Sequence, residues 1–329
     1  MPVDGLPLAR ARALVPDAAP EDVADLGIGV GIVRGDAAHV WLTSRHARGL
    51  GPALLWARRH GARRLRVVAE RDAGLLARRA AEWDPARMAV EVLDARLAPV
   101  AAAPHEPSPA VPAAAEALAA TIAGAGAEPV REHGVLAGEV LGLEVCRVAV
   151  DAATGAARLE IGVGVHDRET FGLLHGAEPP SEALARVVER VRAAREPHGA
   201  GARATAADPL ARLADERRER RRAIADPARV DAATLAPVEP PVARDNVRDA
   251  VPCAAHGTDA RGRELVVVFA AEADPDVVPW AADARLRCAA PDARLVLAMA
   301  SRNAMPAIRA SAEALRVPAE FVDPSAHRG

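Results

Sequence analysis

Two glutamates on neighbouring predicted strands are the residues whose type and spacing best suit chemistry. Residues 138–151 and 157–166 are apolar runs with interspersed polar positions, and this pattern predicts the two strands of a hairpin. Glu144 lies on the first strand and Glu160 on the second. Antiparallel pairing can bring both carboxylates to one divalent cation, because Mg²⁺ and Mn²⁺ favour oxygen ligands. If this site is catalytic, Glu144 and Glu160 are therefore the expected ligands of Mg²⁺ or Mn²⁺.

Two further residues complete this candidate site. Side chains alternate between the two faces of a strand, so His166 shares the face of Glu160, and Asp167 follows at the strand end. The catalytic candidates are therefore Glu144, Glu160, His166 and Asp167, with the last two assisting the metal ligands. The alternative interpretation is structural. In it, the same residues form the solvated face of a hairpin whose other face is apolar core.

The elements around these glutamates occur in the order helix, strand, strand with an acid, strand with an acid, helix. This order resembles the core of the restriction-endonuclease-like (PD-(D/E)XK) nuclease fold, with Glu144 matching the family's first acid and Glu160 its second. The family places a lysine two residues after the second acid, where this sequence has Gly162. The resemblance implies a scaffold that keeps the fold without cleavage, or an enzyme in which Arg168 supplies the missing positive charge.

An arginine-rich segment forms a second candidate site. Residues 214–224 (ADERRERRRAI) predict a helix that carries Arg217, Arg218 and Arg221. Arginine forks match phosphate oxygens, so these side chains are candidate nucleic-acid contacts and nucleic acid is a candidate partner. The alternative is a solvated helix in which Glu216 pairs with an arginine one turn later.

Missing residue types exclude several enzyme classes. The chain has no lysine, tyrosine or glutamine, so its 42 lysine-or-arginine positions are all arginine. A P-loop lysine, a Schiff-base lysine, a Ser–Lys nucleophile pair and a tyrosine general acid are therefore excluded. The net charge of −3 gives the chain as a whole no attraction to nucleic acid or to an anionic membrane.

Composition predicts a globular protein that does not enter a membrane. Half of the residues are hydrophobic, and charged residues interrupt every apolar stretch before it reaches the about 18 residues of a membrane span. The N-terminus lacks the continuous apolar segment of a secretory signal. Cys146, Cys253 and Cys288 are an odd number of cysteines at wide spacing, which fits reduced thiols. These features predict a cytoplasmic location.

The order of predicted elements indicates an α/β fold with two ββαβαβ-type modules flanking a central α/β hairpin module. The predicted domains are an N-terminal α/β module at 1–97, a Pro/Ala linker at 98–112, a central helix–hairpin–helix module at 113–225, a Pro-rich connector of extended coil at 226–250, and a C-terminal module at 251–323. A second linker is predicted at 196–208. The outer modules carry Trp56 and Trp280 in their first helices and end in similar strands, which predicts an internal repeat; convergent α/β patterning is the alternative.

Individual elements follow from the same patterns. The predicted strands are 27–33, 39–43, 65–69, 88–93, 128–133, 138–151, 157–166, 251–256, 264–270, 294–300 and 319–322. The predicted helices are 50–60, 73–83, 113–124, 181–194, 276–287 and 305–316, with a further one starting at Asp208 before the arginine-rich segment.

Function is less constrained than fold. The leading hypothesis is a non-catalytic binding or regulatory protein on a degenerate nuclease-like scaffold, because the sequence contains no complete catalytic set. The alternative is a metal-dependent nuclease or phosphodiesterase that uses the central-hairpin carboxylates. A small-molecule binder, with its site at the carboxyl ends of the strands, is the third class.

Overall fold

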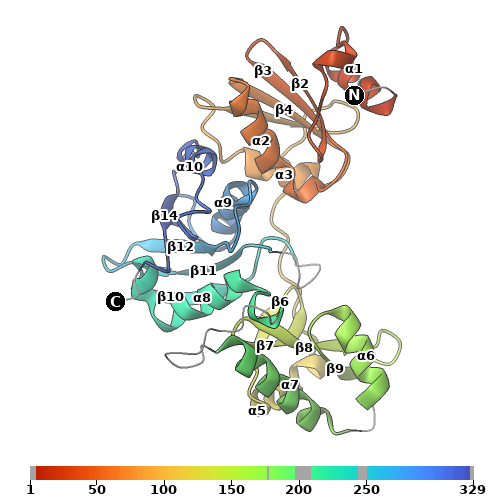
Figure 1. Cartoon of the computed structure of the whole chain (residues 1–329), viewed down its shortest axis with the longest axis vertical. Helices are drawn as coiled ribbons and strands as arrows, with labels where there is room; N and C mark the ends of the chain where they lie inside the picture. The colour runs from red at the N-terminus through yellow and green to blue at the C-terminus, as the bar shows by residue number, and fades with distance from the viewer. Residues whose placement is uncertain (1–4, 176–177, 197–208, 244–249, 327–329) are drawn as a thin grey trace. The chain divides into compact units, whose positions relative to one another are not determined.

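The computed structural model describes residues 5–175, 178–196, 209–243 and 250–326 (Figure 1). The protein is mixed α/β with two five-stranded sheets and one four-stranded sheet, which confirms the predicted fold class. The chain forms two compact units: Met1–His105, Arg263–Val267 and Ala273–Asp323 make the first, and Glu106–Gly262, Val268–Glu272 and Pro324–Gly329 the second. The linker predicted at 196–208 lies, from residue 197 on, outside the described residues.

The N-terminal sheet has the predicted ββαβαβ order and one additional edge strand. Its strands, in spatial order, are β1 (Ala24–Asp25), β2 (Gly29–Arg34), β3 (Ala37–Leu42), β4 (Arg64–Ala69) and β5 (Ala89–Leu93). Strands β2 and β3 form a hairpin around Gly35, whose φ of 59° costs glycine little because it has no Cβ. Strands β3, β4 and β5 are parallel, and helices α2 (Leu50–Arg59) and α3 (Ala73–Ala80) connect them.

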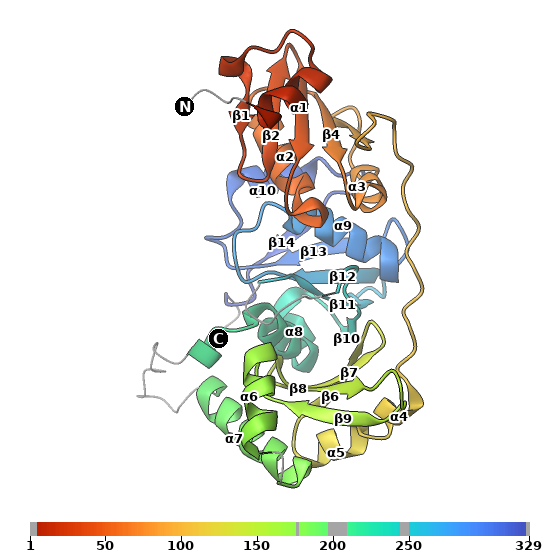
Figure 2. The same cartoon turned by 90° about the vertical axis from the view of Figure 1, so that its right-hand side faces the viewer.

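Helices cover both faces of the N-terminal sheet. Helices α2 and α3 pack on one face, where Gly31 leaves room for Trp56; a Cβ at Gly31 would lie 2.7 Å from the indole ring. Helix α1 (Leu6–Leu14), which the sequence analysis did not predict, packs on the other face (Figure 2). The apolar core beneath α1 contains Ala11, Val15, Ala18, Val23, Val30, Ile32, Trp41, Val68 and Leu93.

The C-terminal sheet has the same strand order as the N-terminal one. Its strands, in spatial order, are β10 (Thr234–Val238), β11 (Cys253–Thr258), β12 (Glu264–Phe269), β13 (Arg294–Ala298) and β14 (Glu320–Val322). Strands β10 and β11 are antiparallel and β13 and β14 parallel, and the helices of this region are α9 (Val277–Cys288) and α10 (Pro306–Glu313). The expectation of extended coil throughout 226–250 is wrong for β10. Pro237 suggested coil, but an edge strand tolerates proline.

The second unit contains an antiparallel meander of four strands. They are, in order, β6 (Glu128–Glu132), β7 (Val135–Val140), β8 (Leu143–Val150) and β9 (Ala157–Ile161). The single strand predicted at 138–151 is wrong, because Leu141 and Gly142 form a turn with φ values of 48° and 80°. The strand predicted at 157–166 is wrong beyond Ile161: Gly164 has a φ of 84° and helix α6 (Val165–His175) begins at the next residue.

Three helices in the described part of the chain cover the apolar face of the meander. They are α4 (Ala113–Glu116), α5 (Ala119–Gly124) and α7 (Pro180–Arg195), the first two replacing the single helix predicted at 113–124. Leu184, Val188 and Val191 of α7 are buried in this core, because their spacing places them on one face of the helix. The arginine-rich segment forms α8 (Asp215–Ala225), preceded by a short 3₁₀ turn at Pro209–Ala211; the predicted start at Asp208 lies outside the described residues. No helix among the residues that the structure describes is long and apolar enough to cross a membrane.

Candidate functional site

A row of carboxylates crosses the polar face of the four-stranded meander. Glu128 of β6 lies directly opposite Glu139 of β7, and Glu139 lies directly opposite Glu144 of β8. Side chains in directly opposite positions are near neighbours, and like charges placed there repel one another. A stable fold therefore needs cations beside this row, and arginines provide them.

A bulge in β8 decides which residues share this face. Ala137 of β7 pairs with Arg147 and Glu139 pairs with Glu144, so β8 uses one residue more than β7 over the same interval. The extra residue places Glu144 and Arg147 on one face although they are three positions apart. Two guanidinium nitrogens of Arg147 each donate a hydrogen bond of 3.1 Å to Glu144.

The predicted metal ligands are each engaged by arginine. Glu144 also accepts a hydrogen bond of 2.9 Å from Arg168 of α6, which the resemblance named as a substitute charge. Glu160 lies opposite Arg147 and accepts a hydrogen bond of 2.8 Å from Arg158. Arginine beside both carboxylates does not favour a shared cation, since the guanidinium groups already neutralise them. Metal binding by Glu144 and Glu160 stays a prediction.

The two assisting residues lie on a helix and not at a strand end. His166 and Asp167 belong to the first turn of α6, because the chain leaves the sheet after Ile161. His166 is exposed and lies 3.7 Å from Glu169 one turn later. Across the described residues, no group of three or more histidine, cysteine, aspartate or glutamate side chains is arranged to hold a metal ion. The predicted catalytic set is therefore not gathered around a metal centre.

The arginine-rich helix α8 faces the carboxylate row. Arg217 is buried and donates hydrogen bonds to both Glu139 and Glu132. Arg221 pairs with Glu128, and Arg218 lies 2.9 Å from Asp215 on its own helix. Two of the three predicted nucleic-acid contacts, Arg217 and Arg221, therefore pair with carboxylates of the meander, and the third pairs within its own helix.

Arg220 also belongs to this cluster. Its Nη1 lies 3.8 Å from Glu132, so it faces strand β6 as Arg217 does. The alternative interpretation of α8 as a solvated helix is therefore wrong for its buried side, which includes Glu216, Arg217 and Arg220. This buried side faces β6, β10 and β11, and only the remaining side is available to solvent.

A cavity of about 380 Å³ lies beside these ion pairs. Its charged lining includes Glu128, Glu132, Glu139, Arg217, Arg220 and Arg221. Ile224 and Val238 add apolar surface, and Glu239 completes the wall next to β10. Glu239 is held in place by Ser108 and by the backbone N–H of His133, which donates a hydrogen bond of 2.7 Å. We call this site the mixed-charge cavity.

Burial sets the protonation of the two central residues. Burial raises the pKa of the Glu139 carboxyl, while Arg217 and Arg220 act in the opposite direction. For Arg217, burial alone would lower the pKa, but Glu139 and Glu132 outweigh it and raise the pKa of the guanidinium. Arg217 is thus a permanent cation, and Glu139 is a carboxylate that accepts a proton more readily than an exposed one. The wall of the cavity can therefore match charged ligand groups and take up a proton.

Sequence reasoning missed the carboxylates of this cavity. Glu128 and Glu132 are four residues apart on the predicted strand 128–133, and the two-residue period of a strand places both on one face. That signal was available for Glu128 and Glu132. The position of Glu139 opposite Glu128 could not be predicted, because the turn at Leu141 was not recognised and β7 was not identified as a separate strand. The pairing of α8 with this face depends on tertiary packing and has no local sequence signal.

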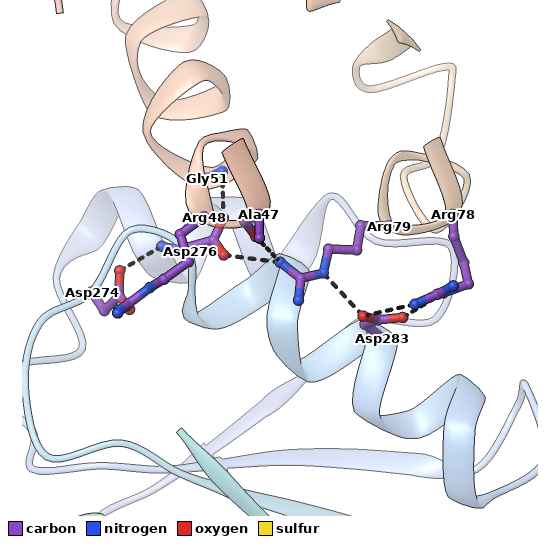
Figure 3. Close-up of polar contacts among 8 residues, drawn as sticks. All are labelled: Ala47, Arg48, Gly51, Arg78, Arg79, Asp274, Asp276 and Asp283. Atoms are coloured by element: carbon purple, nitrogen blue, oxygen red, sulfur yellow. Dashed lines mark hydrogen bonds and ion pairs between the residues drawn. The ribbon is translucent and has the colours of Figure 1, made fainter. Parts of the chain in front are cut away.

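A second charged cluster, in the first unit, is fully occupied by its own partners (Figure 3). Arg79 of α3 donates hydrogen bonds of 3.1 Å to Asp276 and to Asp283 and one of 2.6 Å to the Ala47 carbonyl oxygen. Arg78 donates to Asp283 at 2.7 Å. These buried groups connect α3 with α9 and leave little capacity for a ligand, so we interpret the cluster as structural. The sequence signal was Asp283, which follows an apolar run at 277–282 in the predicted helix 276–287.

Comparison of the chain with protein-family models, with curated proteins and with solved structures gives no match.

Proposed function

We propose that this protein is a non-catalytic binding module whose mixed-charge cavity holds a small zwitterionic ligand. The observation that carries the proposal is the buried Arg217–Glu139 pair in the wall of a cavity of about 380 Å³. Ligand pockets have volumes of roughly 300–1,000 Å³ and combine apolar surface with a few placed polar groups. The cavity has this size and this composition.

The ligand class follows from the charges. Opposite charges alternate along the wall, because each carboxylate on β6 and β7 is paired with an arginine of α8. A ligand that carries both an ammonium group and a carboxylate can replace partners in these ion pairs. Its ammonium group binds a glutamate and its carboxylate binds an arginine, so no net charge is left buried. A purely anionic ligand would meet Glu128, Glu132 and Glu139, and a purely cationic one would meet the arginines. An amino-acid-like zwitterion therefore fits best.

The experiment is isothermal titration of the full chain with a panel of free amino acids and betaines. We expect saturable binding of at least one zwitterion. Glu139→Gln should weaken that binding at least tenfold, because a charge-assisted hydrogen bond contributes about 1.5–3 kcal/mol. Glu160→Gln, on the same sheet but outside the cavity lining, is the matched control and should bind as the wild type does.

Two results would contradict the proposal. Failure of every zwitterion to bind a folded wild-type protein would exclude this ligand class. Metal-dependent cleavage of nucleic acid would favour the alternative, a nuclease or phosphodiesterase using the central carboxylates. It would also support the interpretation of the scaffold as nuclease-like.

We also propose an internal repeat and a cytoplasmic location. The repeat is supported by the identical strand order of the two five-stranded sheets, each with an antiparallel first pair and a parallel last pair. The location is supported by the three free cysteines. Cys146 and Cys253 are buried, and burial raises the pKa of each thiol to about 12, which makes both unreactive.

A further inference from the structure

A second cavity lies on the N-terminal sheet, in the first unit. Its volume is about 420 Å³, and it covers the amino-terminal ends of β3, β4 and β5. Two cross-strand rows form its floor: Ala37, Arg64 and Ala89 are in register, and so are His39, Arg66 and Glu91. These rows lie outside the apolar core that α1 shares with the same sheet face. We call this site the His39 cavity.

His39 is a buried polar side chain without a partner for one ring nitrogen. The residue is 8 % exposed and lines the cavity, and its Nδ1 atom has no hydrogen-bond partner. Buried polar atoms nearly always have a partner, because leaving one unsatisfied costs about 1–3 kcal/mol. His39 therefore places unused hydrogen-bonding capacity beside the cavity.

Arginines make the surroundings of His39 electropositive. Burial lowers the pKa of His39, and Arg66 and Arg64 of β4 lower it further. Arg34 of β2 is a third guanidinium in the lining, and Glu91 of β5 is its acidic member. Arg34 is paired with Asp22 at 2.6 Å, so Arg66 and Arg64 are the cations that act on the imidazole, and an anion that binds these two arginines is the favoured ligand.

The existing ion pairs of these arginines can be exchanged. Arg64 pairs with Asp36 at 2.7 Å and Arg66 with Glu91 at 2.8 Å, and all four side chains are at least 42 % exposed. Exposed pairs of this kind contribute only about 0–1 kcal/mol. A dianion that accepts bonds from two guanidinium forks and an imidazole can compete with them, because phosphate oxygens match the arginine fork.

We propose that the His39 cavity binds an organic phosphate monoester. The phosphate group accepts hydrogen bonds from His39, Arg64 and Arg66, and the organic part lies against Ala37 and Ala89, which share their face of the sheet. An organic part is needed because the cavity is far larger than a phosphate ion. This inference concerns a different unit of the chain from the mixed-charge cavity and does not depend on it.

Binding should be coupled to protonation of His39. The charged groups around the imidazole are Arg64 and Arg66 from β4, Glu91 from β5 and Arg34 from β2, and Asp36 and Asp22 are the acidic partners of Arg64 and Arg34. A bound dianion offsets the arginine charge and favours the imidazolium, so binding takes up a proton and strengthens as the pH falls. Sulfate separates this effect from the titration of phosphate itself, because its charge is constant over the range used.

The experiment is isothermal titration of the full chain with phenyl phosphate, inorganic phosphate and sulfate at about pH 5.5 and about pH 8. We expect phenyl phosphate to bind more tightly than inorganic phosphate, and sulfate to bind at least threefold more tightly at the lower pH. His39→Gln should abolish the pH dependence for sulfate, and Arg66→Gln should weaken phenyl phosphate at least tenfold. Arg59→Gln, an exposed arginine on α2 outside the cavity, is the matched control.

Several outcomes would overturn the proposal. They are absence of phenyl phosphate binding, equal weakening by Arg59→Gln and Arg66→Gln, and an unchanged sulfate pH dependence in His39→Gln. Equal affinity for sulfate, inorganic phosphate and phenyl phosphate would indicate an adventitious anion only. Circular dichroism melts confirm that each variant is folded. Because Arg66 is about half-exposed, its substitution tests the site even if His39→Gln proves unstable.

Discussion

The backbone N–H of Gly51 donates a hydrogen bond of 2.9 Å to the buried carboxylate of Asp276, which lies 225 positions further along the chain. Asp276 also accepts from Arg79, so one carboxylate joins α2, α3 and α9 (Figure 3). The first unit therefore combines both ends of the sequence around a buried polar connection. Buried polar interactions that are shielded from solvent depend strongly on geometry. The stability of the first unit should therefore be sensitive to small shifts of the groups in this connection.

Gly51→Ala should destabilise the first unit. A Cβ at Gly51 would lie 2.1 Å from the carbonyl oxygen of Pro275, a backbone atom that cannot move without displacing α9. Overpacking of this kind costs about 1–3 kcal/mol, and the lost hydrogen bond to Asp276 adds to it. The measurement is urea unfolding. Gly124→Ala is the matched control, since a Cβ at Gly124 meets nothing within 4 Å; equal stability of the two variants would contradict the prediction.

Asp276→Asn should remove a pH dependence of stability. Burial raises the pKa of Asp276 from 3.8 to about 7, against the opposing effects of Arg79 and the Gly51 N–H. Between pH 3.8 and about pH 7, Asp276 carries a proton in the folded protein, whereas in the unfolded chain it has released that proton. Stability is therefore highest below the unfolded pKa and falls as the pH rises toward 7. From about pH 5 to about pH 8, the wild type should lose on the order of 2–3 kcal/mol relative to the variant.

Asp283→Asn is the companion variant for this measurement. Asp283 accepts from both Arg78 and Arg79, so its substitution leaves two buried cations without their carboxylate. Breaking a buried ion pair costs about 3–5 kcal/mol, and this loss should appear at both pH values. If Asp276→Asn showed the same uniform loss, Asp276 would be ionised in the folded protein and the predicted pH dependence would be wrong.

Arg217→Met and Arg221→Met should differ sharply, although both arginines lie on α8 and pair with carboxylates of the meander. The Arg217 side chain is 7 % exposed and serves Glu132 and Glu139, whereas the Arg221 side chain is 47 % exposed and pairs with Glu128. Arg217→Met should cost about 3–5 kcal/mol and Arg221→Met about 0–1 kcal/mol. Urea unfolding checks both values. Equal and small losses would mean that the Arg217 pairs do not stabilise the unit.

Local sequence patterns predicted strands β2 to β5 of the N-terminal sheet closely, because each of these four strands carries its own signal, whereas the two-residue edge strand β1 was missed. The hairpin at Gly35 is an example, since glycine is the residue that its positive φ favours. The meander was harder to predict because Leu141 adopts a φ of 48°, which apolar residues rarely do, and the strand pattern runs through it without interruption. Alternating Val163 and Val165 likewise continued a strand pattern into the start of α6.

The candidate sites depended on information that is not local. Helix α1 and strand β10 have weak patterns of their own and are formed by packing and pairing with distant residues. The ion pairs of Arg217 with Glu139 and of Arg79 with Asp276 connect residues that are 78 and 197 positions apart. Spacing rules for helices and strands cover only a few residues, so they cannot identify such partners. The residue types were visible in the sequence, but their pairing was not.

A cleavage assay on single- and double-stranded DNA and RNA with Mn²⁺ or Mg²⁺ tests the remaining alternative. We expect no metal-dependent cleavage, because Arg147 and Arg168 already hold Glu144, and Arg158 holds Glu160. A cation would have to displace these guanidinium groups to reach both carboxylates. Glu160→Ala is assayed beside the wild type. Cleavage that requires the metal and disappears in this variant would place a nuclease site on the meander. Cleavage that survives in it would indicate a contaminating nuclease, and the protein would remain a binding module.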